Sequence, residues 1–235
     1  MAKKKTKESA VAVKKDWKPI IVYVLMQGVS IGAGIILAII ASIQAYEVNP
    51  EDVNVSVDST ALTILSSVLM LAAAVIICVM YRKRIKDDAK RLKPKQWGLL
   101  LLATIGLLAI NFAITSSFEA LGIQMSNQDS IKDSMGQAAI ATALMAAVAA
   151  PILEEFVFRY SFGTIIKNKM AFIIVSSVIF GLLHGVGVVT ILYIILGLFF
   201  VMTYLKTDRN IVASIVMHFL NNLIGVIGIL MTLGQ

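Results

Sequence analysis

Five ionisable side chains lie inside apolar stretches of the chain, where such groups are rare. They are Glu154, Glu155, Arg159, His184 and His218. An ionisable group is costly inside a lipid bilayer, so each one indicates a functional site by default. Both histidines of the sequence belong to this set. A carboxylate and an imidazole that meet in a dry site can hold a water molecule and accept its proton, as the hydrolysis of a peptide bond requires.

The spacing of the two adjacent glutamates predicts different roles for them. Glu155 and Arg159 are four residues apart, so on a helix they share one face and can form an ion pair. Glu154 is five residues from Arg159, which places it about 140° round a helix of 3.6 residues per turn. Arg159 can therefore neutralise Glu155 and leave Glu154 to point elsewhere.

Two further pairs have helical spacing. His218 and Asn222 are four residues apart, and Phe180 precedes His184 by one turn. A helix rises about 1.5 Å per residue, so the depth of each residue can be counted from the nearest basic turn. The depth is roughly 20 Å for Glu154, His184 and Asn222, each measured along its own segment. His218 lies roughly 13 Å along the segment that contains Asn222. Three helices would thus bring polar side chains to one layer of the membrane.

These residues form three motifs, which are Glu154-Glu155-x-x-x-Arg159, Phe180-x-x-x-His184 and His218-x-x-x-Asn222. In this order and on separate apolar segments, they resemble the CAAX-prenyl endopeptidase and bacteriocin-processing family of intramembrane proteases, also called CPBP or Abi proteins. The resemblance covers about residues 138–233. It implies that Glu154 and His184 activate a water molecule, and that His218 and Asn222 form the oxyanion site.

Other protease chemistries fit the sequence less well. Glu154, His184 and His218 could form the two-His, one-Glu set of a catalytic zinc, but they lack the H-E-x-x-H spacing, so we favour a reaction without a metal or other cofactor. The apolar segments contain no aspartate for an aspartyl dyad. The string at 28–32 matches G-x-S-x-G, yet it lies in an apolar helix rather than at a strand–helix turn. We interpret its glycines as small residues that allow close helix packing.

Simpler interpretations exist for each residue alone. Glu155 and Arg159 could be a structural ion pair, either histidine could be a packing residue, and amides such as Asn222 can join membrane helices. A non-catalytic bacteriocin-immunity or partner-binding protein of the same fold is therefore the alternative to an endopeptidase. A proton-coupled transporter ranks last, because the sequence has neither an inverted repeat nor paired broken spans.

The composition indicates the environment that must hold these residues. Hydrophobic residues make up 58% and charged residues 15% of 235 positions, whereas a soluble domain averages about 45–50% apolar and about 25% charged. The chain is therefore expected to be an all-α, polytopic transmembrane helical bundle, since a segment in lipid must satisfy its own backbone hydrogen bonds. Seven segments have the length and character of spans, namely 19–45, 61–81, 97–117, 138–166, 170–184, 186–205 and 211–233.

The distribution of charge predicts the orientation. Apart from Lys132 and Arg159, every Lys and Arg lies in one of four stretches, which are 1–18, 82–95, 167–169 and 206–209. The alternate loops, 46–59 and 118–137, are acidic. The positive-inside rule then predicts a cytoplasmic N-terminus and an external C-terminus. Because each basic cluster flanks an apolar segment, the net charge of +7 does not indicate a nucleic-acid partner.

The expected organisation has three parts. Residues 1–18 form a basic cytoplasmic tail, 19–137 form three N-terminal transmembrane helices, and 138–235 form a catalytic four-helix membrane core. The single cysteine, Cys78, excludes an intramolecular disulfide. The expected partners are a peptide or protein substrate and the lipid bilayer, in a bacterial plasma membrane, and the oligomeric state is left open.

Overall fold

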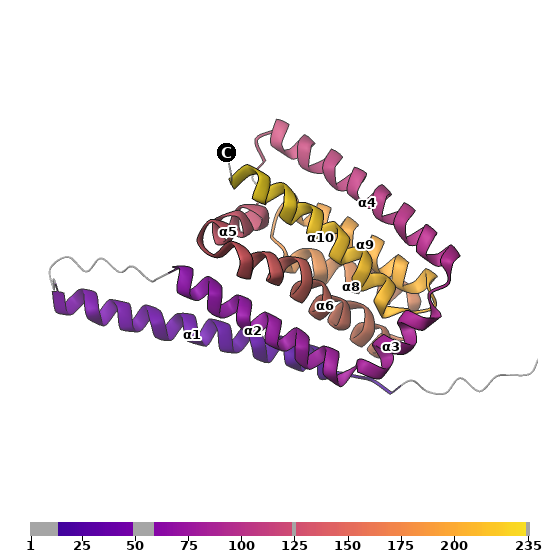
Figure 1. The fold of residues 1–235 in the computed structure, drawn as a ribbon, viewed down its shortest axis with the longest axis horizontal. Helices are drawn as coiled ribbons and strands as arrows, with labels where there is room; N and C mark the ends of the chain where they lie inside the picture. The colour runs from indigo at the N-terminus through magenta and orange to yellow at the C-terminus, as the bar shows by residue number, and fades with distance from the viewer. Residues whose placement is uncertain (1–13, 49–58, 124–125, 234–235) are drawn as a thin grey trace, which may run out of the picture.

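The computed structural model describes residues 14–48, 59–123 and 126–233, and this part of the chain is helical without strands. Its elements are α1 (Lys18–Val48), α2 (Ser59–Met80), α3 (Arg82–Arg91), α4 (Pro94–Ala120), α5 (Ser126–Leu144), η1 (Met145–Ala149), α6 (Ala150–Glu155), η2 (Phe156–Ser161), α7 (Phe162–Ile165), α8 (Lys169–Leu183), α9 (Val189–Lys206) and α10 (Ile211–Leu233). The η stretches are π-helical and join the part of α5 that follows Ala138 to α6 and α7 in one rod (Figure 1).

The helices confirm an all-α membrane fold. Within the described residues, six helical stretches are long and apolar enough to cross a bilayer, namely α1, α2, α4, the stretch Ser130–Ile165, α9 and α10. Helix α8 is apolar but has only 15 residues, which agrees with the short fifth segment expected from the sequence. Each of the seven expected segments therefore corresponds to a helix of a multi-pass membrane protein.

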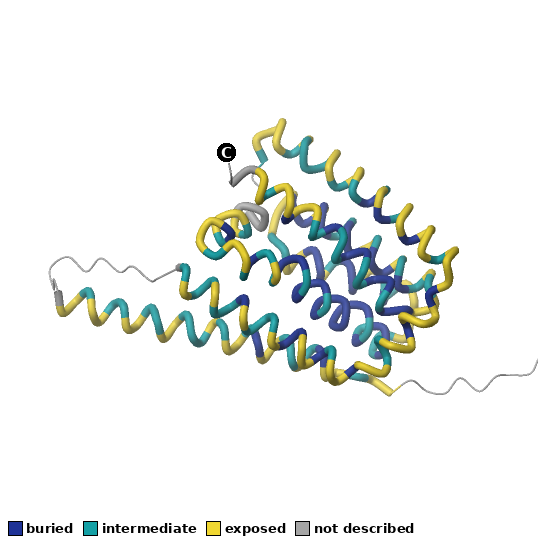
Figure 2. The backbone as a smooth tube through the Cα atoms, in the orientation of Figure 1, coloured by how far each residue is buried: buried dark blue, intermediate teal, exposed yellow. Residues whose placement is uncertain are grey.

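The buried centre of the bundle lies in α6, α8, α9 and α10, whereas α1 and α4 are largely exposed on its two flanks (Figure 2). Two glycines lie where α8 and α9 pack closely against each other. A Cβ on Gly181 would lie 3.0 Å from the backbone nitrogen of Ile194, and one on Gly197 would lie 3.1 Å from the Cα of Ser177. The absence of side chains at these two points brings the helices together.

The packing interpretation of the G-x-S-x-G string was wrong within this chain. Gly28 is exposed and Gly32 is half-buried, and a Cβ on either would meet no described atom within 4 Å. These two glycines therefore do not lie against a neighbouring helix, although the same part of α1 buries Met26 in the core.

Two segments expected as loops contain helices. The basic stretch after α2 forms α3, and its Asp88 is buried against the start of α10, where the carboxylate accepts from the backbone N–H of Ile211 at 2.9 Å. The acidic stretch after α4 contains the first half of α5, which precedes a break in the helix at Ala138. The expected span begins at this break.

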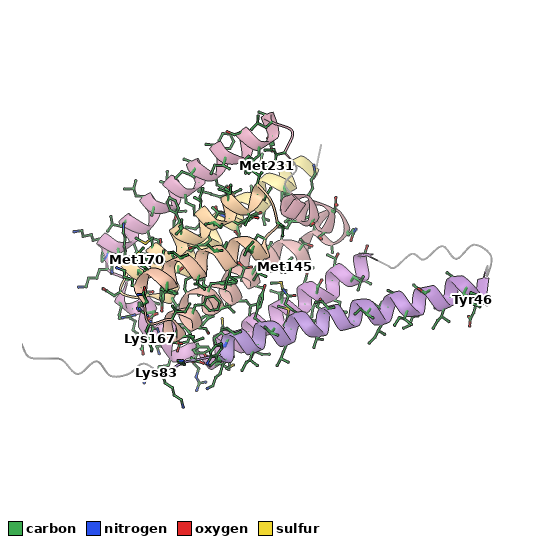
Figure 3. All side chains as sticks on the ribbon, turned by 180° about the vertical axis from the view of Figure 1, so that it is seen from behind. Tyr46, Lys83, Met145, Lys167, Met170 and Met231 are labelled. Carbon is green, nitrogen blue, oxygen red and sulfur yellow. The ribbon has the colours of Figure 1, made fainter. Side chains whose placement is uncertain are left out.

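Lys83 and Lys167 lie at one end of the bundle, and Tyr46 lies at the far end of α1 (Figure 3). The clustering of basic residues at one end agrees with the charge pattern, while the side of the membrane stays a prediction. Most of the basic tail, residues 1–13, and part of the first acidic loop, residues 49–58, lie outside the described residues.

Candidate active site

The rod that carries the adjacent glutamates contains a π-helical turn, η1, caused in part by a proline. The N–H of Ala150 bonds to the carbonyl of Met145, five residues back, and Pro151 has no N–H to donate. The carbonyl of Ala146 thus loses both of its usual donors within the rod. The side-chain amide of Asn222 donates to it at 3.0 Å, so that α10 is tied to the rod at this turn.

The second π-helical turn, η2, has a similar tie to α8. The N–H of Phe162 bonds to the carbonyl of Val157, again five residues back. The buried hydroxyl of Ser176 donates to the carbonyl of Phe158 at 2.9 Å. Helix α6 is therefore held between two π-helical turns, each of which is bonded to a neighbouring helix. Such turns are frequent at functional sites.

Glu155 forms the inner ion pair that the helical spacing predicts. Its Oε2 lies 3.1 Å from Nε of Arg159, and neither side chain is exposed. The same carboxylate accepts a hydrogen bond from Ser214 and lies 3.0 Å from Nδ1 of His218. The guanidinium of Arg159 also lies 4.9 Å from the centre of the Phe180 ring. Both oxygens of the Glu155 carboxylate thus have partners, and the carboxylate positions Arg159 and His218.

Glu154 faces the cavity and both imidazoles. Its Oε2 lies 3.7 Å from Nε2 of His184 and 3.8 Å from Nε2 of His218. These distances exceed a direct hydrogen bond and suit a water molecule between the groups. This carboxylate oxygen is buried and has no hydrogen-bond partner among the described residues.

Nδ1 of each imidazole is held by a hydrogen-bond acceptor. His184 Nδ1 lies 2.7 Å from the carbonyl oxygen of Phe180, and His218 Nδ1 lies against the Glu155 carboxylate. Both Nδ1 atoms therefore carry protons, and both Nε2 atoms face Glu154. Aromatic rings fix the two planes, because Tyr193 stacks on His184 at 4.6 Å between ring centres and Phe200 stacks on His218 at 4.2 Å.

Arg159 supplies a positive charge beside Glu155. The Nε2 atom of His218 faces the cavity and is a donor to a ligand when it carries a proton, since Nδ1 is already held by Glu155. Nε2 of His184 presents a lone pair beside Glu154, because its Nδ1 proton is held by the carbonyl of Phe180.

Asn222 reaches the same cavity by a chain of amides. Asn111 of α4 donates to Asn221 at 3.2 Å, Asn221 donates to Asn222 at 3.1 Å, and Asn222 donates to Ala146. An amide nitrogen has two N–H groups, so Asn222 keeps one donor for a ligand. The chain fixes the plane of this amide from two neighbouring helices.

These groups line a cavity of about 750 Å³. Glu154, His184, His218 and Asn222 all contribute to its wall, together with Phe180. The structure therefore brings together every residue of the three motifs around this site, with Glu155 and Arg159 behind the wall.

The side-chain types at the site would suit zinc. In the described parts of the chain, no group of three or more His, Cys, Asp or Glu is found in an arrangement that would hold a metal ion.

Sequence reasoning missed Ser214, Tyr193 and Phe200, which contact Glu155 and the two imidazoles. Ser214 precedes His218 by four residues, so the helical spacing that identified Asn222 could have found it. Tyr193 and Phe200 stack on the imidazoles from α9. They lie in an apolar run, and the sequence of that run does not distinguish residues that contact the site from residues that only pack in the bundle.

The fold and the site are those of a multi-pass membrane protein with a buried glutamate–histidine site. Comparisons with known proteins identify the family to which it belongs. A profile of the family described as Type II CAAX prenyl endopeptidase Rce1-like matches residues 136–224. This stretch contains all three motifs, and the chain belongs to this family.

Two bacterial relatives extend the likeness beyond the matched stretch. The chain is 28% identical over 206 residues to the Bacillus subtilis (strain 168) protein named "Putative membrane peptidase YdiL", covering 83% of this chain and 82% of the relative. It is 32% identical over 147 residues to the UPF0177 protein YxdF of Lactococcus lactis subsp. lactis (strain IL1403), covering 60% and 81% respectively. No solved structure matches significantly. Together, the family and the first relative support a membrane peptidase.

Proposed function

We propose that this protein is an intramembrane endopeptidase of the glutamate type, which hydrolyses a peptide bond of a peptide or protein substrate in a bacterial plasma membrane. The observation that carries the proposal is the unpartnered Oε2 of Glu154, which faces Nε2 of both His184 and His218 across 3.7 and 3.8 Å. A buried carboxylate oxygen with two imidazoles at this distance is a natural site for a reactive water molecule.

The reaction begins at that water. Glu154 accepts one proton, and His184 Nε2 accepts a hydrogen bond from the other, so that the oxygen can attack the carbonyl carbon of the substrate. The C–O bond forms as the carbonyl becomes an oxyanion. His218 Nε2–H and the remaining N–H of Asn222 donate to this oxygen, and each good donor contributes about 10²–10³ in rate.

The intermediate then collapses. The carbonyl forms again, the bond from carbon to nitrogen breaks, and Glu154 returns its proton to the departing nitrogen. The products are one carboxylic acid and one amine, and Glu154 is ionised again for the next water. Glu155 and Arg159 take no part in proton transfer but hold His218 and the rod in place.

A cleavage assay with a matched control tests the proposal. The purified protein is placed in lipid vesicles with a panel of internally quenched peptides that have apolar centres, and cleavage is read as fluorescence. We expect Glu154→Gln to abolish cleavage, whereas Glu119→Gln, at an exposed position of α4, should match the wild type. Cleavage that survives in Glu154→Gln, or its absence from every peptide with the wild type, would favour a partner-binding or immunity protein of the same fold.

A further inference from the structure

The N-terminal helix contributes to the cavity although it lies outside the matched family stretch. Tyr23 and Gln27 of α1 line the same cavity as Glu154. They are four residues apart, so they share one face of the helix. Helix α1 packs against η2, which directly follows the two glutamates.

The two side chains leave one donor and one acceptor for a ligand. Nε2 of Gln27 donates to the hydroxyl oxygen of Tyr23 at 3.2 Å. A phenol has one proton to donate, and no described residue accepts it from Tyr23. The carbonyl oxygen of the Gln27 side chain likewise has no donor in the described part of the chain.

Most of the remaining wall is apolar. Its contributors from the N-terminal helices and from α10 include Met70, Leu108, Phe112, Ile224, Val226 and Ile229. Glu154 is the one Asp, Glu, Lys or Arg among the described lining residues. Apart from Glu154 and the two histidines, the described wall offers no partner of opposite sign to a charged side chain of a substrate, whereas apolar side chains would be buried favourably.

A helical apolar segment of a substrate must unwind before its backbone can be attacked. The backbone N–H and C=O groups that unwinding frees then need new hydrogen-bond partners. Inside a membrane, an unsatisfied backbone N–H or C=O costs several kcal/mol. A cavity that admits an extended peptide must therefore supply both donors and acceptors along it. The free donor of Tyr23 and the free acceptor of Gln27 are one such pair.

We infer that Tyr23 and Gln27 form a subsite for the substrate backbone, which holds an unwound, apolar and uncharged peptide segment beside Glu154. The hydroxyl of Tyr23 donates to a carbonyl oxygen of the segment, and the carbonyl oxygen of Gln27 accepts from one of its N–H groups. The inference rests on the proposed function and assigns the substrate class. Helix α1 is then a part of the binding site as well as a membrane span.

Binding is measured first, without turnover. The Glu154→Gln protein in lipid nanodiscs is titrated with a fluorescent peptide whose centre is Leu and Ala and whose ends are lysines. Adding Tyr23→Phe or Gln27→Met should weaken binding about threefold to tenfold, which is the size of one hydrogen bond. Tyr46→Phe, at the exposed end of the same helix, is the matched control and should change nothing. An Asp in the centre of the peptide should weaken binding more than tenfold.

A change on the peptide side separates a backbone contact from a packing effect. Replacing one peptide amide by an ester removes a single N–H, and the ester is moved along the segment. At one position the ester should weaken binding to the Gln27-containing protein, yet have no further effect in Gln27→Met. Such non-additivity is the mark of a direct contact. A helix-packing role would give additive effects at every position and would overturn the inference.

The kinetics distinguish this inference from the proposed function. In the protein with Glu154 intact, Tyr23→Phe and Gln27→Met should raise KM and leave kcat within about twofold, as expected for uniform binding. If wild-type cleavage depends on Glu154 but both variants have the wild-type KM, the subsite inference is wrong and the proposed endopeptidase function is retained. If the wild type cleaves no peptide at all, both the inference and the proposed function are wrong.

Discussion

Nδ1 of His218 lies 3.0 Å from Oε1 of Glu155, and this contact decides which ring nitrogen faces the cavity. Glu155 is an acceptor that also pairs with Arg159, so it orients the imidazole with its Nδ1–H inward. The Nε2 atom then faces Glu154. Two glutamates that are neighbours in the sequence therefore act on opposite nitrogens of one ring, which predicts different effects when each is neutralised.

Glu155→Gln should lower stability as well as activity. It leaves the fully buried Arg159 without its counter-charge, and breaking a buried pair in this way costs about 3–5 kcal/mol. Thermal unfolding of the purified protein, followed by intrinsic fluorescence, should show a clearly lower Tm. Cleavage should fall because His218 is no longer oriented.

Glu154→Gln is the control for that experiment, because Glu154 faces the cavity and has no ion pair with Arg159. Its Tm should stay close to the wild-type value while cleavage is lost. Equal loss of Tm in the two variants would contradict the division between a positioning and a reacting glutamate.

Gly181→Ala should separate α8 from α9. The added Cβ would lie 3.0 Å from the backbone of both Ile194 and Thr190, and overpacking of this kind typically costs about 1–3 kcal/mol. Because His184 follows on the same helix, activity should fall with stability. Both are measured as Tm and as the rate of peptide cleavage.

Gly32→Ala serves as the matched control, since a Cβ there meets nothing within 4 Å. Alanine is the better helix former by about 0.5–1 kcal/mol, so this variant should be as stable as the wild type or slightly more stable. A loss of Tm in Gly32→Ala would show that α1 packs closely against another molecule at this glycine.

The membrane class and the approximate spans could be predicted from composition and segment length, because lipid imposes both. The helix α3 could not, since its many charges suggested only a hydrophilic loop. In the structure its Asp88 accepts a hydrogen bond from the backbone N–H of Ile211 at the start of α10, which ties α3 to the bundle. That contact joins residues more than a hundred positions apart, and no local spacing encodes it.

At the site, helical phase correctly predicted that Glu155 pairs with Arg159 while Glu154 points elsewhere. The π-turns escaped prediction, although Pro151 is one visible cause, because a proline can also kink or end a helix. The contribution of Tyr23 and Gln27 depends on how α1 packs against the rod. Such packing between helices is a tertiary property that spacing within one segment does not contain.

The orientation in the membrane is tested by labelling introduced cysteines. In a background of Cys78→Ala, single cysteines at Asp52 and at Lys86 are exposed to a membrane-impermeant maleimide on intact cells. The positive-inside rule predicts that only the Asp52→Cys protein is labelled from outside. Labelling of both positions before lysis would contradict the proposed topology, and labelling of Lys86→Cys alone would invert it.

His218→Ala and Asn222→Ala should have similar kinetic effects if both residues donate to the oxyanion. Each loss removes a donor that acts in the transition state, so kcat should fall by about 10²–10³ with little change in KM. The double variant should lose less than the product of the two effects, because both donors act on one oxygen. A large rise in KM in either single variant would instead assign that residue to substrate binding.

Metal removal decides between water activated by Glu154 and water activated by zinc. A reaction that needs only side chains should survive prolonged chelation, and the purified protein should contain far less than one zinc per chain. If His218 were a zinc ligand, chelation would inactivate the enzyme and added zinc would restore it, since metal ligands hold the ion by direct bonds. In that case His218→Ala would lose both the metal and the activity, whereas Asn222→Ala would retain the metal, because amides are poor zinc ligands. Elemental analysis of the wild type and of these two variants therefore gives a readout independent of cleavage. One tightly held zinc per chain, lost in His218→Ala but kept in Asn222→Ala, would overturn the assignment of His218 as an oxyanion donor.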